Sequence, residues 1–175
     1  KTDVTLPTID GQRYGGKDVE FLKFIDLPSR VDVALEVAVS GDAPRQQLQR
    51  HGWLVADAFQ HSHSLDAYHA YLRQSRGECS IAKNAYVASR SGWFSTRSAA
   101  YLALGKPVVV QDTGFRSRLP TGAGVFAFDD LDEAAAAIAS VEGDYKRHCD
   151  AARAVAESEF AAERVLGRLL KDVGL

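Results

Sequence analysis

The chain has 175 residues, 46% hydrophobic and 25% charged, which is typical of one folded globular domain. Its formal net charge of −2 argues against a duplex nucleic-acid binder, because such proteins usually carry a basic excess on one face. No apolar run approaches the roughly 18 residues needed to span a membrane, and the first ten residues lack the apolar core of a signal peptide. We therefore expect a cytoplasmic protein that is not transmembrane and has no nucleic-acid partner.

The spacing of apolar residues and the positions of Gly and Pro divide the chain into alternating strands and helices. The first half predicts an apolar piece at 4–9, a helix at 18–25, a strand at 31–39, a helix at 44–51, a strand at 53–58 and a helix at 64–72. The second half predicts a strand at 79–82, a helix at 96–104, strands at 107–111 and 125–128, and helices at 131–141, 144–159 and 163–173.

This alternation predicts the fold class. Short apolar strands separated by helical crossovers form a parallel sheet that helices cover on both faces. Because the crossovers are nearly always right-handed, we expect an α/β fold with a doubly wound, Rossmann-like parallel sheet in a single domain over 1–175. Such sheets bind ligands beyond the carboxyl ends of their strands, so a site is expected in the loops that follow strands.

The last predicted helix carries an apolar stripe formed by Val165, Leu166, Leu169, Leu170 and Val173. The stripe either packs on the sheet of this domain or docks on a second domain outside this chain. The chain begins with Lys1 and contains no methionine, so we expect it to be a piece of a longer protein.

The segment SGWFSTRSAAYLALGKPVVVQDTG, residues 91–114, gathers polar residues at the start of a short helix. Ser95 is a good N-cap, and Gly105 and Pro107 end the helix. The free N–H groups and partial positive charge at such an N-terminus favour an anion. The residues predicted to bind a diphosphate here are Gly92, Ser95, Thr96, Arg97 and Ser98.

A simpler interpretation of this segment stays open. Ser95 can act only as a cap, and Arg97 can pair with a carboxylate on the surface. After the next strand, Asp112, Thr113 and Gly114 form a polar turn. They are either turn residues alone or ligands of a sugar hydroxyl.

The order of these segments resembles the C-terminal, donor-binding domain of GT-B glycosyltransferases. YLALGKPVVVQDTGF and GAGVFAF are similar to the helix–Gly–Pro–strand unit of that family and the strand after it. AARAVAESEF is similar to part of its C-terminal helix pair, and YGGKDVEFLKF and SRGECSIAKNAYV resemble bacterial members. The resemblance covers nearly the whole chain.

The resemblance implies that the chain binds a nucleotide-diphosphate sugar whose sugar moves to an acceptor hydroxyl, without a metal or other cofactor. It implies that Lys17 and Lys83 lie near the phosphates; each can equally be a solvated surface lysine. It also implies a partner, an N-terminal domain that supplies the acceptor pocket and the catalytic base. Gly92 and Ala100 stand where many retaining members carry glutamates, so the catalytic residues are unknown.

Other sites and functions have weaker support in the sequence. Cys79 and Cys149 form no CxxC pair and are expected to be free thiols. His61 and His63 lack acidic or Cys partners at a zinc-site spacing, so no metal site is predicted. The alternative functions are a non-catalytic nucleotide-binding or interaction module of the same fold, and another doubly wound protein such as an epimerase or a receiver-like regulator.

Overall fold

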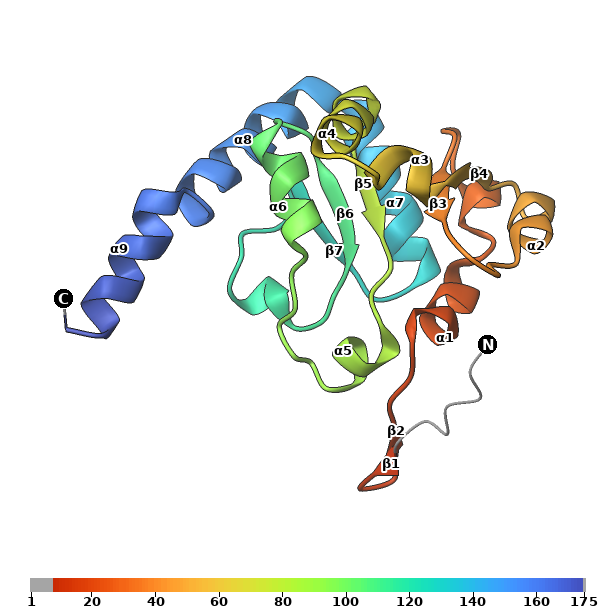
Figure 1. Cartoon of the computed structure of the whole chain (residues 1–175), viewed down its shortest axis with the longest axis horizontal. Helices are drawn as coiled ribbons and strands as arrows, with labels where there is room; N and C mark the ends of the chain where they lie inside the picture. The colour runs from red at the N-terminus through yellow and green to blue at the C-terminus, as the bar shows by residue number, and fades with distance from the viewer. Residues whose placement is uncertain (1–7, 175) are drawn as a thin grey trace.

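The computed structural model describes residues 8–174, whose helices and strands are labelled in Figure 1. The strands are β1 (Thr8–Ile9), β2 (Gln12–Arg13), β3 (Glu36–Val39), β4 (Leu54–Asp57), β5 (Glu78–Ser80), β6 (Val108–Gln111) and β7 (Val125–Phe128). The α-helices are α1 (Lys17–Phe21), α2 (Arg45–Arg50), α3 (Ala58–Ser62), α4 (Leu65–Gln74), α5 (Asn84–Ala88), α6 (Thr96–Ala103), α7 (Leu131–Gly143), α8 (Tyr145–Glu159) and α9 (Ala162–Asp172). Short 3₁₀ helices occupy Leu22–Phe24, Leu27–Arg30 and Phe115–Ser117.

The strands form small parallel sheets packed against helices, so the protein belongs to the α/β class. β3 pairs with β4, and β5, β6 and β7 form a second parallel sheet in that order. β1 and β2 form a separate antiparallel pair. Over residues 8–174 the structure therefore has two parallel sheets where the sequence predicted one, because β3 and β5 line a common cavity and form no ladder.

Helices cover both faces of the three-stranded sheet (Figure 1). Alternate side chains of β6 pack against these two layers of helices. Val109 packs in a cluster with Ile138 of α7, whereas Val108 and Val110 pack in a second cluster that includes residues of α6 and α8. This alternation follows from the two-residue period of a strand. The continuous run of valines correctly predicted a strand with two buried faces, because both sides of β6 are covered by helices.

Many predicted elements are confirmed. The strand at 125–128 has the predicted bounds, and the Ser64 Oγ accepts a 3.1 Å hydrogen bond from the Ala67 N–H at the start of α4. Gly105 has a φ of +66° just after α6, as expected for a helix-ending glycine. Residues 4–7 of the first predicted piece lie outside the described residues.

Other elements differ from the prediction. The predicted strand at 31–39 is regular only over Glu36–Val39, and the helix predicted at 18–25 ends at Phe21 and continues as a 3₁₀ turn. Helices α3 and α5 were missed because each has five residues, too few to show a helical apolar period.

Helix α9 extends away from the body of the molecule (Figure 1). The side chains of its apolar stripe, from Val165 to Val173, are exposed. Of the two alternatives for this stripe, packing on the sheet of the same domain is therefore wrong, since α9 contacts mainly the end of α8. Among the helices of residues 8–174, none combines the length and apolar character that crossing a membrane requires.

Candidate functional site

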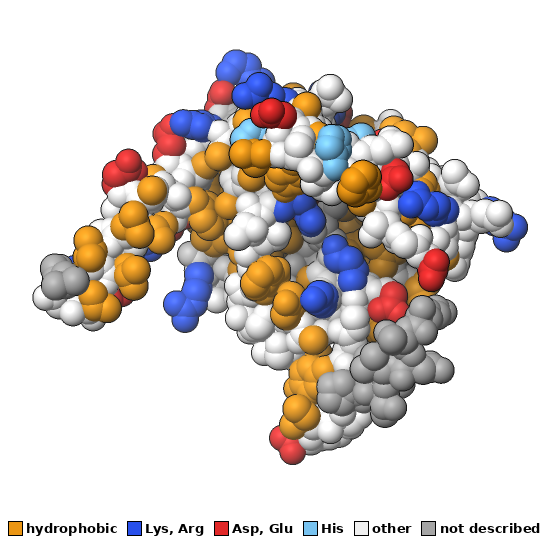
Figure 2. Space-filling view, in the orientation of Figure 1, with side chains coloured by type: hydrophobic (Ala, Val, Ile, Leu, Met, Phe, Trp, Pro, Cys, Tyr) orange, Lys and Arg blue, Asp and Glu red, His pale blue; other side chains and the backbone are white. Residues whose placement is uncertain are grey.

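A cavity of about 1170 Å³ lies between the edge strands β3 and β5. Figure 2 shows that this face of the molecule is hollowed near its centre and that Lys and Arg side chains gather around the hollow. The cavity wall is apolar along 33–39 and near Trp53, and it is polar where Lys17, Glu78 and Arg97 line it. Its volume exceeds that of most small-molecule sites, which are usually about 300–1,000 Å³.

Arg97 joins the start of α6 to β5. Its guanidinium donates to the Glu78 Oε1 at 2.6 Å and to the Ser80 Oγ at 2.8 Å, while its backbone N–H donates to the Ser95 Oγ at 3.2 Å. Partial burial lowers the pKa of Arg97, but the Glu78 carboxylate outweighs burial and raises the pKa above its ordinary value. Arg97 thus pairs with a carboxylate, as the simpler interpretation expected, and this carboxylate is buried. The side chain of Arg97 is still 42% exposed and reaches the cavity.

Lys17, the first residue of α1, lines the same cavity. The pKa of Lys17 is lowered because its ammonium is partly removed from water and because the Arg97 guanidinium lies nearby; Lys83 acts in the same direction. The structure therefore brings together three residues that the sequence predicted from distant segments. We call Lys17, Lys83 and Arg97 the cation group.

A buried carboxylate holds the segments that carry the two lysines. Glu20 accepts hydrogen bonds at Oε1 from the Asn84 Nδ2 at 2.7 Å and the Lys23 Nζ at 2.8 Å, and at Oε2 from the Gln111 Nε2 at 2.8 Å. Gln111 in turn accepts from the Ala82 N–H at 3.0 Å. This network ties α1 to the end of β6 and to the loop that carries Lys83.

The backbone strengthens this connection. The N–H groups of Asn84 and Ala85 donate to the carbonyl oxygens of Gly16 and Gly15 at 3.1 and 3.0 Å. The Gly15 N–H donates back to the Asn84 Oδ1 at 2.7 Å. Because Gly16 precedes Lys17 and Asn84 follows Lys83, these bonds join the two backbone segments that carry the lysines.

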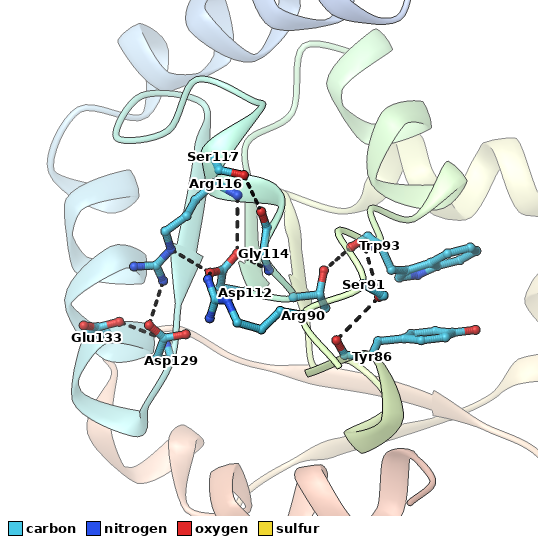
Figure 3. Close-up of polar contacts among 11 residues, drawn as sticks. Tyr86, Arg90, Ser91, Trp93, Asp112, Gly114, Arg116, Ser117, Asp129 and Glu133 are labelled. Atoms are coloured by element: carbon cyan, nitrogen blue, oxygen red, sulfur yellow. Dashed lines mark hydrogen bonds and ion pairs between the residues drawn. The ribbon is translucent and has the colours of Figure 1, made fainter. Parts of the chain in front are cut away.

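A second polar cluster surrounds Asp112 at the end of β6 (Figure 3). The buried carboxylate of Asp112 pairs with Arg90 at 3.2 Å and with Arg116 at 2.9 Å, and it accepts from the Gly114 N–H at 2.9 Å. Arg116 also pairs with Asp129 at 3.0 Å. The carboxylate therefore joins the turn after β6 to the loop after α5.

Thr113 holds the loop before α6. Its hydroxyl donates to the Trp93 carbonyl oxygen at 2.6 Å, and its own carbonyl oxygen accepts from the Gly92 N–H at 2.8 Å. Gly92 has a φ of +74°, a conformation that glycine adopts without strain. At Gly114 a Cβ would lie 3.0 Å from the Arg90 carbonyl oxygen, so this glycine permits a close approach of two loops.

The predicted site residues fall into two sets. Lys17, Lys83 and Arg97 come together, and Thr96 is exposed at the first turn of α6 near them. The other predicted residues are engaged elsewhere or hidden. The Ser95 side chain caps α6, and Ser98 is buried. Asp112 forms ion pairs with arginines of this chain, and the Thr113 hydroxyl donates to the Trp93 carbonyl oxygen.

Sequence reasoning missed Glu20, Glu78, Asn84 and Gln111, which position the cation group. Glu78 and Gln111 gave a usable signal, since each is a polar residue at one end of a strand predicted to be buried. Glu20 gave none, because a glutamate in a short helix is usually exposed.

Within residues 8–174 no three His, Cys, Asp or Glu side chains are grouped so that they could hold a metal ion. No protein-family model matches this chain, and no curated protein is significantly similar to it.

Proposed function

We propose that this chain binds the donor of a glycosyl-transfer reaction, a nucleotide-diphosphate sugar, with the diphosphate on Lys17, Lys83 and Arg97. The observation that carries the proposal is the convergence of cations from distant segments: Lys17 and Arg97 line the large cavity, and Lys83 is close enough to Lys17 to act on its charge. Glu78 balances one of the three charges, which leaves two positive charges within this group. A diphosphate supplies the complementary negative charge and several strong acceptor oxygens.

The start of α6 supports the same placement. The first N–H groups of a helix lack intrahelical partners and carry a partial positive charge. Thr96 lies exposed in this first turn, and Arg97 reaches from it into the cavity. In the GT-B family that the sequence resembles, the corresponding helix points its N-terminus at the donor diphosphate.

The cavity offers room for the rest of the donor. Its volume of about 1170 Å³ can accommodate a nucleoside, and its wall combines apolar strand residues with Tyr71, Ser75 and Tyr101. We also propose that the chain has the doubly wound, Rossmann-like fold of the GT-B domain. The parallel strands and the helices on both faces of the sheet are compatible with that fold.

In glycosyl transfer the leaving group is the nucleoside diphosphate, and negative charge grows on it as the sugar departs. The cation group would stabilise this charge by fixed electrostatic interactions. A catalytic base is harder to assign in this chain. The carboxylates of Glu78 and Asp112 are buried and paired with arginines, and Gly92 and Ala100 carry no carboxylate.

These observations favour a two-domain enzyme in which this chain binds the donor and an N-terminal domain provides the catalytic base and the acceptor pocket. They equally favour the second candidate function, a nucleotide-binding module without catalysis. The two differ in one measurement: transfer of a sugar from the bound donor when the N-terminal domain is supplied.

Binding of UDP, GDP, dTDP and ADP, measured by thermal shift and calorimetry, tests the proposal. At a ligand concentration one hundred times the dissociation constant, the preferred nucleotide should stabilise the chain by about 2.7 kcal/mol, or about 5–10 °C in Tm. Lys17→Ala and Lys83→Ala should each weaken binding about tenfold, the scale of one charge-assisted hydrogen bond.

Lys146→Ala is the matched control, because Lys146 is an exposed lysine on α8 that pairs only locally with Asp150. Binding to this variant should equal binding to the wild type. The proposal fails if no nucleoside diphosphate stabilises the chain, or if the Lys17 and Lys83 variants bind as well as the control does.

A further inference from the structure

Tyr86 and Trp93 form a stacked aromatic pair on the surface of the molecule. Their ring centroids lie 5.0 Å apart with an interplanar angle of 26°, and Trp93 is 48% exposed. Figure 3 shows the two rings side by side, pointing away from the Asp112 cluster. We call this pair the aromatic platform. Exposed large aromatic surface is uncommon on proteins and often marks a binding site.

The aromatic platform is held in place before any ligand arrives. The Trp93 carbonyl oxygen accepts from the Thr113 hydroxyl at 2.6 Å, and the Trp93 N–H donates to the Ser91 Oγ at 3.3 Å. The Gly92 N–H donates to the Thr113 carbonyl oxygen at 2.8 Å. A ligand that stacks on these rings therefore pays little for ordering the loop, which favours binding.

The rim of the platform is polar. The Tyr86 hydroxyl and the Trp93 indole N–H are hydrogen-bond donors at the edges of the two rings. The Lys83 ammonium lies over the face of the Tyr86 ring, 5.6 Å from its centroid. The platform thus combines an apolar ring face at Trp93 with hydrogen-bond donors at the ring edges and a cation over Tyr86.

We propose that Tyr86 and Trp93 bind a hexose ring. One face of a pyranose consists largely of C–H groups, which pack on the negative face of an aromatic ring, and its edge carries hydroxyls that can accept from Trp93, Tyr86 and Lys83. A nucleobase would also stack on the rings, but it has fewer hydroxyl groups to match the polar rim.

Such a ring has two possible sources, the glycosyl group of the donor and a glycan acceptor. The donor source rests on the function proposed above, because Lys83 belongs to the cation group and also lies over the Tyr86 ring of the platform. The acceptor source does not depend on nucleotide binding.

Titrations of the full chain with UDP, GDP, UDP-hexoses, GDP-hexoses and neutral hexose oligosaccharides test the platform. Calorimetry gives affinities. The fluorescence of Trp93 is taken as the difference between the wild type and Trp93→Phe, because Trp53 lines the cavity and can also respond to a nucleotide. Trp93→Ala should weaken binding of a hexose-bearing probe about tenfold, a loss of about 1.4 kcal/mol. Trp93→Phe should retain most of the wild-type affinity. Phe59→Ala, which removes an exposed aromatic ring on α3, is the control and should leave the affinity for the hexose-bearing probe unchanged.

If Trp93→Ala loses affinity for nucleotide-hexoses but not for UDP or GDP, the hexose ring belongs to the donor. If it loses affinity for neutral oligosaccharides, the ring belongs to an acceptor. The inference is overturned if Trp93→Ala weakens the binding of UDP or GDP as much as the binding of the matching nucleotide-hexose, because the rings then stack on the nucleobase. It is also overturned if every hexose probe binds the variant as it binds the wild type, or if none binds the wild type at millimolar concentration. The proposed function fails on a different result: no nucleoside diphosphate binds the chain. That result does not depend on whether the oligosaccharides bind.

Discussion

Arg97 and Glu78 form an ion pair with a 2.6 Å separation in which the two partners differ sharply in exposure. The Glu78 side chain is 5% exposed and its Oε2 has no hydrogen-bond partner among the described residues, whereas Arg97 extends into the cavity. A buried carboxylate without compensation is costly, so Arg97 stabilises the fold, while Glu78 offsets part of the positive charge of the cation group.

A double-mutant cycle measures this pair. Arg97→Ala should lower the free energy of unfolding by about 2 kcal/mol, because it leaves the Glu78 carboxylate unpaired; the loss is smaller than for a fully buried pair because Arg97 is partly solvated. The double variant Arg97→Ala with Glu78→Gln should lose less than the sum of the two single variants.

Urea denaturation supplies the free energies of unfolding for this cycle. The Lys146–Asp150 pair on α8 is the control, since both partners are exposed and their coupling should stay below about 0.5 kcal/mol. Additive effects at Glu78 and Arg97 would show that the pair contributes nothing to stability.

Glu20 should make stability depend on pH in the acid range. Burial alone raises the pKa of its carboxyl group, but hydrogen bonds from Asn84, Lys23 and Gln111 outweigh burial and lower the pKa below its ordinary value of 4.5. Because the pKa is lower in the folded than in the unfolded chain, this contribution to stability is complete above pH 4.5. It is lost as the pH falls from 4.5 through the folded-state pKa.

Glu20→Gln should therefore reduce stability by about 2 kcal/mol at pH 7 and flatten the decline below pH 4.5, as measured by urea denaturation across pH. Glu157→Gln, which alters an exposed glutamate paired with Arg153 on the same helix, should leave the pH profile unchanged. Identical profiles for Glu20→Gln and the wild type would rule out this role of Glu20.

Two nearby glycines should tolerate alanine very differently. A Cβ on Gly124 would lie 2.3 Å from the backbone nitrogen of Ala152 in α8, and its φ is +73°. Gly122 has a φ of +96° but open space around the added Cβ. Gly124→Ala should cost about 3 kcal/mol or more, and Gly122→Ala about 1 kcal/mol, in thermal and urea unfolding. Equal losses would mean that α8 does not pack closely on the strand at Gly124.

Helix α9 should contribute little to the stability of this chain. The side chains of its apolar stripe are exposed, and Arg168 contacts Glu159 weakly, by a 3.8 Å ion pair and a 3.5 Å hydrogen bond to the backbone carbonyl oxygen. Removal of residues 162–175 should change the free energy of unfolding by less than about 1 kcal/mol and should reduce self-association, because it removes exposed apolar surface. Calorimetry and size-exclusion chromatography measure the two effects; a large loss of Tm would place α9 in the core.

The amino-acid sequence by itself determined the local elements and their caps. The continuous valines of β6, the N-cap at Ser64 and the helix-ending Gly105 act over a few residues, so periodicity and backbone preference were enough to predict them. Arg97 could also be named from its place at the start of a predicted helix, and Lys17 and Lys83 from the resemblance to the GT-B family.

Only the tertiary structure decided how these residues combine. It buried Ser98 and Asp112, exposed the stripe of α9 and left a cavity between β3 and β5 where one continuous sheet was expected. The contacts responsible join residues far apart in sequence, such as Glu20 with Gln111 and Arg97 with Glu78. Their energies depend on burial and on the partner across the fold, and local sequence patterns contain neither.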